Sequence, residues 1–194
     1  MKLSINYQES NSRGELLLRS FLGWLYIVIP HTFLMCFACI WLAILNFIKF
    51  WIVIFTGHIP DSTYEFQKKM MHWQLRLNSS IFNLRDGYPA IGPGGSNSDI
   101  TLEFENPEKV NRGLVIVRLL FGPIYILIPH GFCLSFVGIA ASFVLFIAWW
   151  AILFTGKYPE KMFNFIVKYL RWNMRVILYM EYYTDEYPPF NGRE

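Results

Sequence analysis

The sequence predicts an all-α integral membrane protein made of a tandem duplicated module. The 194-residue chain overlays itself without a gap at a shift of about 99 residues, and each copy contains one very long apolar run. Hydrophobic residues make up 54% of the chain and charged residues only 16%, which is too apolar for an average soluble domain. In each copy we expect a short strand, a long hydrophobic helical hairpin or kinked span, and an amphipathic helix.

The repeat sets the expected domain boundaries. Roughly a third of the aligned positions are identical, which is far above chance for so long an ungapped register. We expect one membrane module over residues 1–90, a Gly/Pro/Ser linker over 91–99, and a second module over 100–194. The linker contains Gly92-Pro93-Gly94-Gly95, a strong turn signal.

The apolar runs extend from Phe21 to Gly57 and from Leu119 to Gly156. A straight helix of about 37 residues is roughly 55 Å long, against a hydrocarbon core of ~30 Å. Each run therefore bends into a hairpin, or a surface helix leads into a single kinked span; Pro30 and Pro129 fit both. Because basic residues flank both ends of each run, the positive-inside rule favours two hairpins with both termini in the cytoplasm.

An amphipathic helix is expected after each run. Thr-Gly-x-x-Pro, at Thr56 and Thr155, ends the first helix and opens the next. A basic stripe on an aromatic-rich helix suits the lipid headgroup layer, where Lys and Arg extend and Trp anchors. The alternative is a helix packed on the module with a solvated basic face. The interfacial residues we expect are Lys69, Trp73, Arg76, Lys161, Lys168, Arg171, Trp172 and Arg175.

The start of each copy alternates in polarity. Leu3, Ile5 and Tyr7 alternate with polar residues in the first copy, and Ile100, Leu102 and Phe104 do so in the second. Period-2 alternation predicts strands. We expect the two strands to pair into a small cytoplasmic ribbon.

Three kinds of side chain are candidates for chemistry inside the runs. His31 and His130 each follow a proline, and ionisable groups in membranes are often functional. They are either a haem-binding pair or neutral structural imidazoles. Lys49 is expected to extend to the headgroups, and the cysteines Cys36, Cys39 and Cys133 to pack as small apolar residues. Neither run contains Asp or Glu, which argues against a proton-coupled carrier.

Each copy closes on Asp-x-Tyr-Pro. We expect Asp86 and Tyr88, like Asp185 and Tyr187, to form a structural clamp, with Asp86 paired to Arg76 and Asp185 to Arg175. The sequence has no nucleophile elbow, phosphate loop or zinc spacing. We therefore predict that the protein is not an enzyme, and we expect no cofactor.

These motifs resemble a bacterial membrane family, domain-of-unknown-function family 4389. The second copy matches through Ile128-Pro129-His130, Phe154-Thr155-Gly156, Arg171-Trp172 and Tyr187-Pro188-Pro189-Phe190. The first copy departs from the pattern, with His72 before Trp73 and Ala90-Ile91 in place of the final Pro-Phe. The resemblance implies a membrane location in a bacterium or archaeon, and it carries no known activity.

The expected function follows from these features. We expect a multi-pass, non-catalytic protein of the bacterial inner membrane, an accessory or scaffold subunit that contacts partner subunits and anionic lipid. The alternatives are a lipid-handling or membrane-shaping protein and, third, a haem-binding redox subunit. The formal net charge of +3 is too small to indicate nucleic acid.

Overall fold

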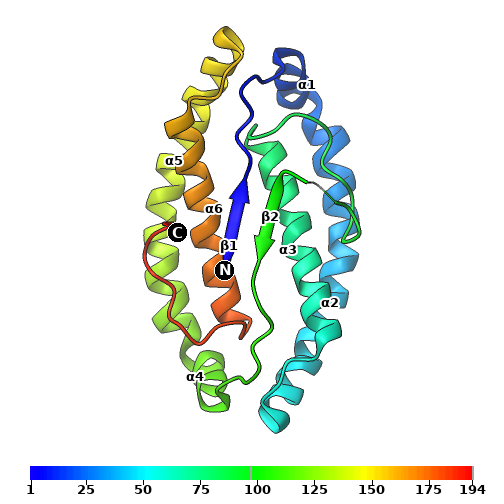
Figure 1. Cartoon of the computed structure of the whole chain (residues 1–194), viewed down its shortest axis with the longest axis vertical. Helices are drawn as coiled ribbons and strands as arrows, with labels where there is room; N and C mark the ends of the chain where they lie inside the picture. Colours follow the sequence, from blue (N-terminus) through cyan, green and yellow to red (C-terminus); the bar gives the residue numbers. More distant parts are fainter. Residues whose placement is uncertain (97, 194) are drawn as a thin grey trace.

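The computed structural model describes residues 1–96 and 98–193 and is mostly helical. The two long helices lie at the flanks, the shorter helices between them, and the two-stranded ribbon at the centre (Figure 1). The elements, in chain order, are β1 (Lys2–Ile5), α1 (Arg13–Gly23), the π-helical η1 (Trp24–Val28), α2 (Ile29–Thr56), α3 (Asp61–Ile81), β2 (Ile100–Glu103), α4 (Arg112–Gly122), the π-helical η2 (Pro123–Leu127), α5 (Ile128–Thr155) and α6 (Glu160–Met180).

Each apolar run is one continuous helix, so the favoured hairpin was wrong. The elements α1, η1 and α2 join into a 44-residue helix, Arg13–Thr56, and α4, η2 and α5 join into Arg112–Thr155. Pro30 lies in the first turn of α2, directly after the π-helical segment η1. A local π-helical turn can accommodate a proline ring without breaking the helix. The chain therefore passes the proline without turning back.

The ends of the long helices lie where the Thr-Gly-x-x-Pro signals place them. Gly57 and Gly156 cap them in the left-handed conformation, with φ of 78° and 72°. Their N–H groups donate to Val53 and Ile152 over 2.8 Å. Glycine adopts this conformation without steric cost, which explains its place there.

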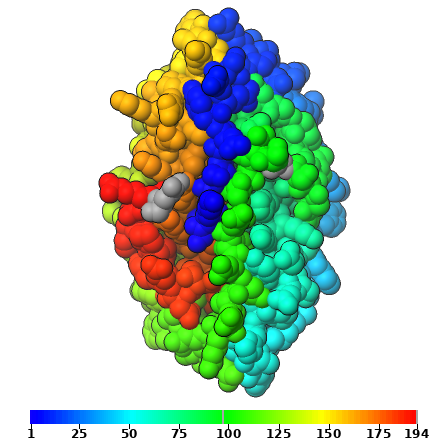
Figure 2. Space-filling view, viewed as in Figure 1, coloured from blue at the N-terminus to red at the C-terminus, as the bar shows by residue number. Residues whose placement is uncertain are grey.

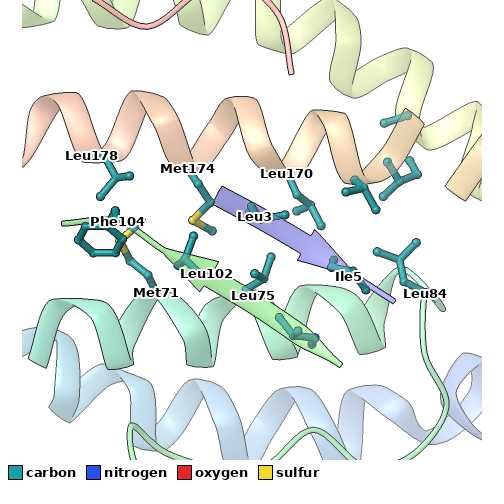
Figure 3. Close-up of a cluster of buried hydrophobic side chains, with 14 of the residues drawn as sticks. Leu3, Ile5, Met71, Leu75, Leu84, Leu102, Phe104, Leu170, Met174 and Leu178 are labelled. Atoms are coloured by element: carbon teal, nitrogen blue, oxygen red, sulfur yellow. The ribbon is translucent and has the colours of Figure 1, made fainter. Parts of the chain in front are cut away.

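The ribbon interlocks the two halves of the chain. Strands β1 and β2 pair antiparallel, with Leu3 opposite Leu102. Arg171 of α6 donates to the Leu3 carbonyl over 2.8 Å, and His72 Nε2 of α3 lies 3.0 Å from the Leu102 carbonyl. Each strand therefore lies against the shorter helix of the other half, as Figures 1 and 3 show.

The hydrophobic core lies between the ribbon and the two shorter helices. Figure 3 shows side chains from both strands pointing between α3 and α6. Both halves contribute to this single cluster, whose labelled members are Leu3, Ile5, Met71, Leu75, Leu84, Leu102, Phe104, Leu170, Met174 and Leu178. Burial of this shared core is the main force that holds the halves together.

The long helices are covered on one side only. Their most apolar windows are only 11% and 17% buried. A core helix of a soluble protein would be mostly covered by its own chain. Figure 2 shows that the opposite, ribbon-bearing face is crossed by the N-terminal segment, the loop after β2 and the C-terminal tail.

Candidate functional site

The two predicted histidines are held by tryptophans. His31 and His130 are fully buried, and Nδ1 of each accepts a hydrogen bond from the indole N–H of Trp73 and Trp172, over 2.8 and 3.0 Å. An indole nitrogen only donates, so Nδ1 must be unprotonated. The imidazoles are therefore neutral and carry their proton on Nε2.

This tautomer does not suit a haem or metal ligand. A metal-binding histidine donates a hydrogen bond from its second ring nitrogen, whereas here that nitrogen accepts. The ring of Phe190 also stacks on His130 at a centroid distance of 4.1 Å. The geometry favours the structural interpretation of both histidines.

The same contacts correct the expected role of the tryptophans. Trp73 and Trp172 are buried inside the protein, with exposed fractions of 1% and 5%. They cannot anchor the helices in a headgroup layer. Their indole rings instead join α3 to α2 and α6 to α5.

The predicted clamps are present, but with different arginine partners. Asp86 binds Arg19 at 2.8 Å, and Asp185 binds Arg118 at 2.9 Å. Arg118 is buried and also donates to the carbonyls of Tyr179 and Thr184, both at 2.9 Å. Arg76 and Arg175, the partners predicted from the sequence, bind other groups. The segment that carries each aspartate turns back toward the start of a long helix and brings the aspartate to a different arginine.

Each clamp aspartate also holds the start of a long helix. The second carboxylate oxygen of Asp86 accepts from the Ser12 amide at 2.6 Å, and that of Asp185 accepts from the Asn111 amide at 3.2 Å. Ser12 and Asn111 are the N-cap residues of α1 and α4. One carboxylate therefore connects the tail, the cap and the helix body.

The clamp tyrosines bind the π-helical segments. Tyr88 donates its hydroxyl to the Tyr26 carbonyl at 3.1 Å, and Tyr187 donates to the Tyr125 carbonyl at 3.0 Å. Tyr26 lies in η1 and Tyr125 in η2. A π-helical turn disturbs the regular bonding of the helix, and these hydroxyls provide partners to its carbonyls.

The basic stripe is only partly exposed. Arg76 and Arg171 are buried, which corrects the expectation that they face lipid headgroups. Arg76 donates to the Gly92 carbonyl over 2.7 Å, and Arg171 to the Gly192 carbonyl over 2.9 Å. The chain after each helix folds over the stripe and covers these guanidinium groups. Arg175 is half-buried, while Lys69, Lys161 and Lys168 are exposed and remain available to headgroups.

His72 occupies the place in the first half that Arg171 has in the second. Burial is the main cause that lowers the pKa of His72; the Leu102 carbonyl raises it, and the nearby Arg76 and Lys68 lower it further. The imidazole is half-buried against β2. The neutral form of His72 is therefore the form that the folded protein favours.

Lys49 is fully buried, which corrects the expectation that it extends to the headgroups. Its ammonium binds the Glu181 carboxylate at 2.6 Å and the Glu181 carbonyl at 3.2 Å. The aromatic rings of Tyr182 and Tyr183 lie 5.6 and 5.0 Å from it. At the positions 99 residues away, the chain has Ala148 and Phe82.

Sequence reasoning missed this ion pair because nothing in the pattern connects positions so far apart. It also missed the bond from Trp149 Nε1 to the Ser20 hydroxyl, 2.7 Å long. One signal was available: Ala148, 99 residues after Lys49, is not basic. It showed that Lys49 does not belong to the repeated pattern, but not where it binds.

The main exposed surface is the outer face of each long helix. We define this outer face by its large exposed apolar side chains. No Asp, Glu or Arg lies between Phe21 and Phe55, and the only Lys and His there, Lys49 and His31, are buried. The side chains that define the outer face include Phe21, Trp24, Phe33, Phe37, Trp41, Phe47 and Phe55 on the first helix, and Leu120, Ile124, Phe132, Phe136, Phe143, Phe146 and Phe154 on the second.

Cys36 and Cys39 lie exposed on the first long helix, and Cys133 is half-buried on the second. All three are free thiols. Because Cys36 and Cys39 are exposed, these small apolar residues do not belong to the core of the protein.

Comparison with known protein families identifies a match in the second half of the chain. Residues 115–191 match the model of a protein family described as Domain of unknown function (DUF4389). No curated protein and no solved structure matches the chain. The match supports the resemblance for the second half and leaves the assignment of the first half as a prediction. The chain thus contains one region similar to the DUF4389 family, from the start of α4 through α6 into the C-terminal tail.

Proposed function

We propose that this chain is a non-catalytic integral membrane protein that acts as an accessory or scaffold subunit of a membrane assembly. The observation that carries the proposal is the uncovered outer face of two 44-residue apolar helices. An exposed apolar surface of this extent marks contact with lipid or with a partner. The buried groups His31, Lys49 and Arg118 each bind a partner within the fold, which supports a structural role for them.

The proposal includes a duplicated module. Its support is a set of contacts that recur at the same shift as the sequence repeat. The bonds of Trp73, Asp86 and Tyr88 recur at Trp172, Asp185 and Tyr187. We place the protein in the bacterial inner membrane with both termini on the cytoplasmic side, because basic residues flank both ends of each apolar run.

A lipid-handling or membrane-shaping function is the second candidate, favoured by the size of the exposed side chains. Helices that pack on one another in membranes prefer small residues at their contacts. The outer face is instead dominated by Phe, Trp, Ile and Leu, as at Phe37, Trp41 and Phe136. Such side chains fit flexible acyl chains well.

Purification of the tagged full-length protein in a mild detergent tests these candidates. Mass spectrometry would quantify the proteins and lipids that come with it. If the chain is an accessory subunit, we expect a second membrane protein to copurify with it at a fixed molar ratio. Recovery with lipid alone would overturn that role in favour of the second candidate. Quantitative recovery from the soluble fraction without detergent would contradict both.

A further inference from the structure

We infer that the two long helices lie along the membrane, with their outer faces in the acyl region of a single leaflet, and do not cross the bilayer. The inference rests on the proposed membrane location and deepens it by naming the surface that meets lipid. Two independent observations support it: the length of the outer face and the place of the charged ribbon. The joined helix ends make the two helices a single unit.

The outer face is too long for a crossing helix. Large exposed apolar side chains extend from Phe21 to Phe55 on the first helix and from Leu120 to Phe154 on the second. At 1.5 Å per residue each stretch is about 50 Å long, against a hydrocarbon core of ~30 Å. To fit that thickness the helices would tilt by about 50°, beyond the range of roughly 0–40° found for crossing helices.

The charged ribbon lies beside the middle of the long helices. Figure 1 shows β1, β2 and the N-terminus near the centre of the longest axis, along which the long helices run. Lys2 and Glu103 are exposed on this ribbon. In a crossing orientation these charges and the N-terminal amine would lie at the depth of the hydrocarbon core, where ionised groups are costly. With the helices along the membrane, the ribbon face can stay in water.

The ends of the two long helices are tied to each other. Arg13 at the start of the first donates to the Phe154 carbonyl at the end of the second over 2.9 Å. The Asn11 amide also donates to the Gly156 carbonyl, and the Val110 amide to the Gly57 carbonyl, both over 2.8 Å. These bonds hold the two long helices side by side as one unit, with Arg13 near one end of the pair and Arg112 near the other.

Site-directed labelling tests this arrangement. In the full-length background C36S/C39S/C133S, single cysteines would replace Glu9 at one end of the pair of long helices, His58 at the other end, and Lys2 on the ribbon. These three residues are exposed, so their replacement leaves the core intact. Membrane vesicles of known sidedness would be treated with a membrane-impermeant maleimide, with the cysteine-free protein as background.

We expect all three sites to be labelled from the same side, with little labelling in vesicles of the opposite orientation. Labelling of Glu9→Cys and His58→Cys from opposite sides would overturn the inference. The result is distinct from a failure of the proposed membrane location. Release of the protein from membranes by an alkaline wash would refute that location, whereas retention with labelling from opposite sides refutes only the single-leaflet arrangement.

Depth measurements give a second readout. Fluorophores on Phe21→Cys, Phe37→Cys and Phe55→Cys, in the same background, report three points along the outer face. In liposomes with lipids brominated at shallow or deep acyl positions, we expect the same ratio of shallow to deep quenching at all three sites. A deep middle site with shallow ends would contradict the inference.

Discussion

Trp73 donates its indole N–H to Nδ1 of His31 over 2.8 Å, inside a part of the fold that excludes water. Trp172 makes the same bond to His130 over 3.0 Å. We expect Trp172→Phe to lower the free energy of unfolding by about 1–3 kcal/mol, because it leaves a buried imidazole nitrogen without a donor. Thermal or denaturant unfolding in detergent micelles would measure the loss.

Trp41→Phe provides the matched control for this change. Trp41 is 52% exposed on the outer face, so the same chemical change removes no buried contact. Equal stability of the two variants would contradict the structural role of the Trp172–His130 bond.

The buried ion pair between Lys49 and Glu181 can be tested with the residues that stand 99 positions away from each partner. Glu181→Phe leaves the Lys49 ammonium buried without its carboxylate, and we expect a loss of about 3–5 kcal/mol. Adding Lys49→Ala then gives these two positions the residues that stand 99 positions away, Ala148 and Phe82. The double variant should regain most of the lost stability, because no unpaired charge remains.

Unfolding measurements on both single variants and the double variant complete this cycle. If Lys49→Ala failed to restore stability to the Glu181→Phe variant, apolar residues such as Ala148 and Phe82 would not be structural equivalents of the ion pair.

The clamp arginine should matter more than the clamp aspartate. Arg118 is buried and donates to two carbonyls as well as to Asp185, whereas the Asp185 side chain is 42% exposed. We expect Arg118→Ala to cost about 3–5 kcal/mol of unfolding free energy, and Asp185→Asn clearly less, since water can reach the carboxylate. Lys168→Ala on the exposed stripe serves as the control for loss of a cation. An equal effect of Asp185→Asn and Arg118→Ala would show that the ion pair, not the carbonyl contacts, dominates.

His72 should make stability depend on pH. Its pKa in the folded protein is lowered, chiefly by burial, below the ordinary value of about 6.5 that holds in the unfolded chain. The unfolded state therefore binds the proton more readily, so stability is complete above about pH 6.5 and falls as the pH drops below it.

A comparison with His72→Gln isolates this contribution. We expect the unfolding temperature of the wild-type protein to fall more between pH 7.5 and 5 than that of the variant. Identical pH profiles for the two proteins would contradict the prediction, because the remaining histidines are common to both.

The sequence predicted the local elements of the fold well. Period-2 alternation placed the strands at Leu3 and Leu102, and the Thr-Gly-x-x-Pro signals placed the ends of the long helices at Gly57 and Gly156. These are local signals, set by side-chain alternation and by the backbone freedom of glycine. They require no knowledge of distant contacts.

The path of each apolar run could not be predicted from the sequence. Length and hydropathy are the same for a hairpin and for a continuous helix, and Pro30 is compatible with both. The π-helical segment before Pro30, and the Tyr88 hydroxyl that binds its Tyr26 carbonyl, decide the outcome. Tyr88 belongs to a segment that returns only after the whole of α3.

The prediction that the whole basic stripe faces lipid headgroups was wrong for a similar reason. Helical spacing shows that Arg171 and Lys168 share a face, but not that β1 and the C-terminal tail cover Arg171. A solvated guanidinium group and one that binds buried carbonyls have the same spacing in the sequence. The partners of Asp86 and Asp185 were likewise set by long-range folding of the tail.

Membrane association of the native protein is the most direct test of the central claim. Membranes from cells that express the full-length protein would be washed at alkaline pH, separated by centrifugation, and assayed for the protein in pellet and supernatant. We expect it to stay in the pellet until detergent is added, because we propose that the exposed apolar outer faces around Phe37 and Phe136 lie in lipid. Release into the supernatant as a folded, soluble protein would contradict the claim.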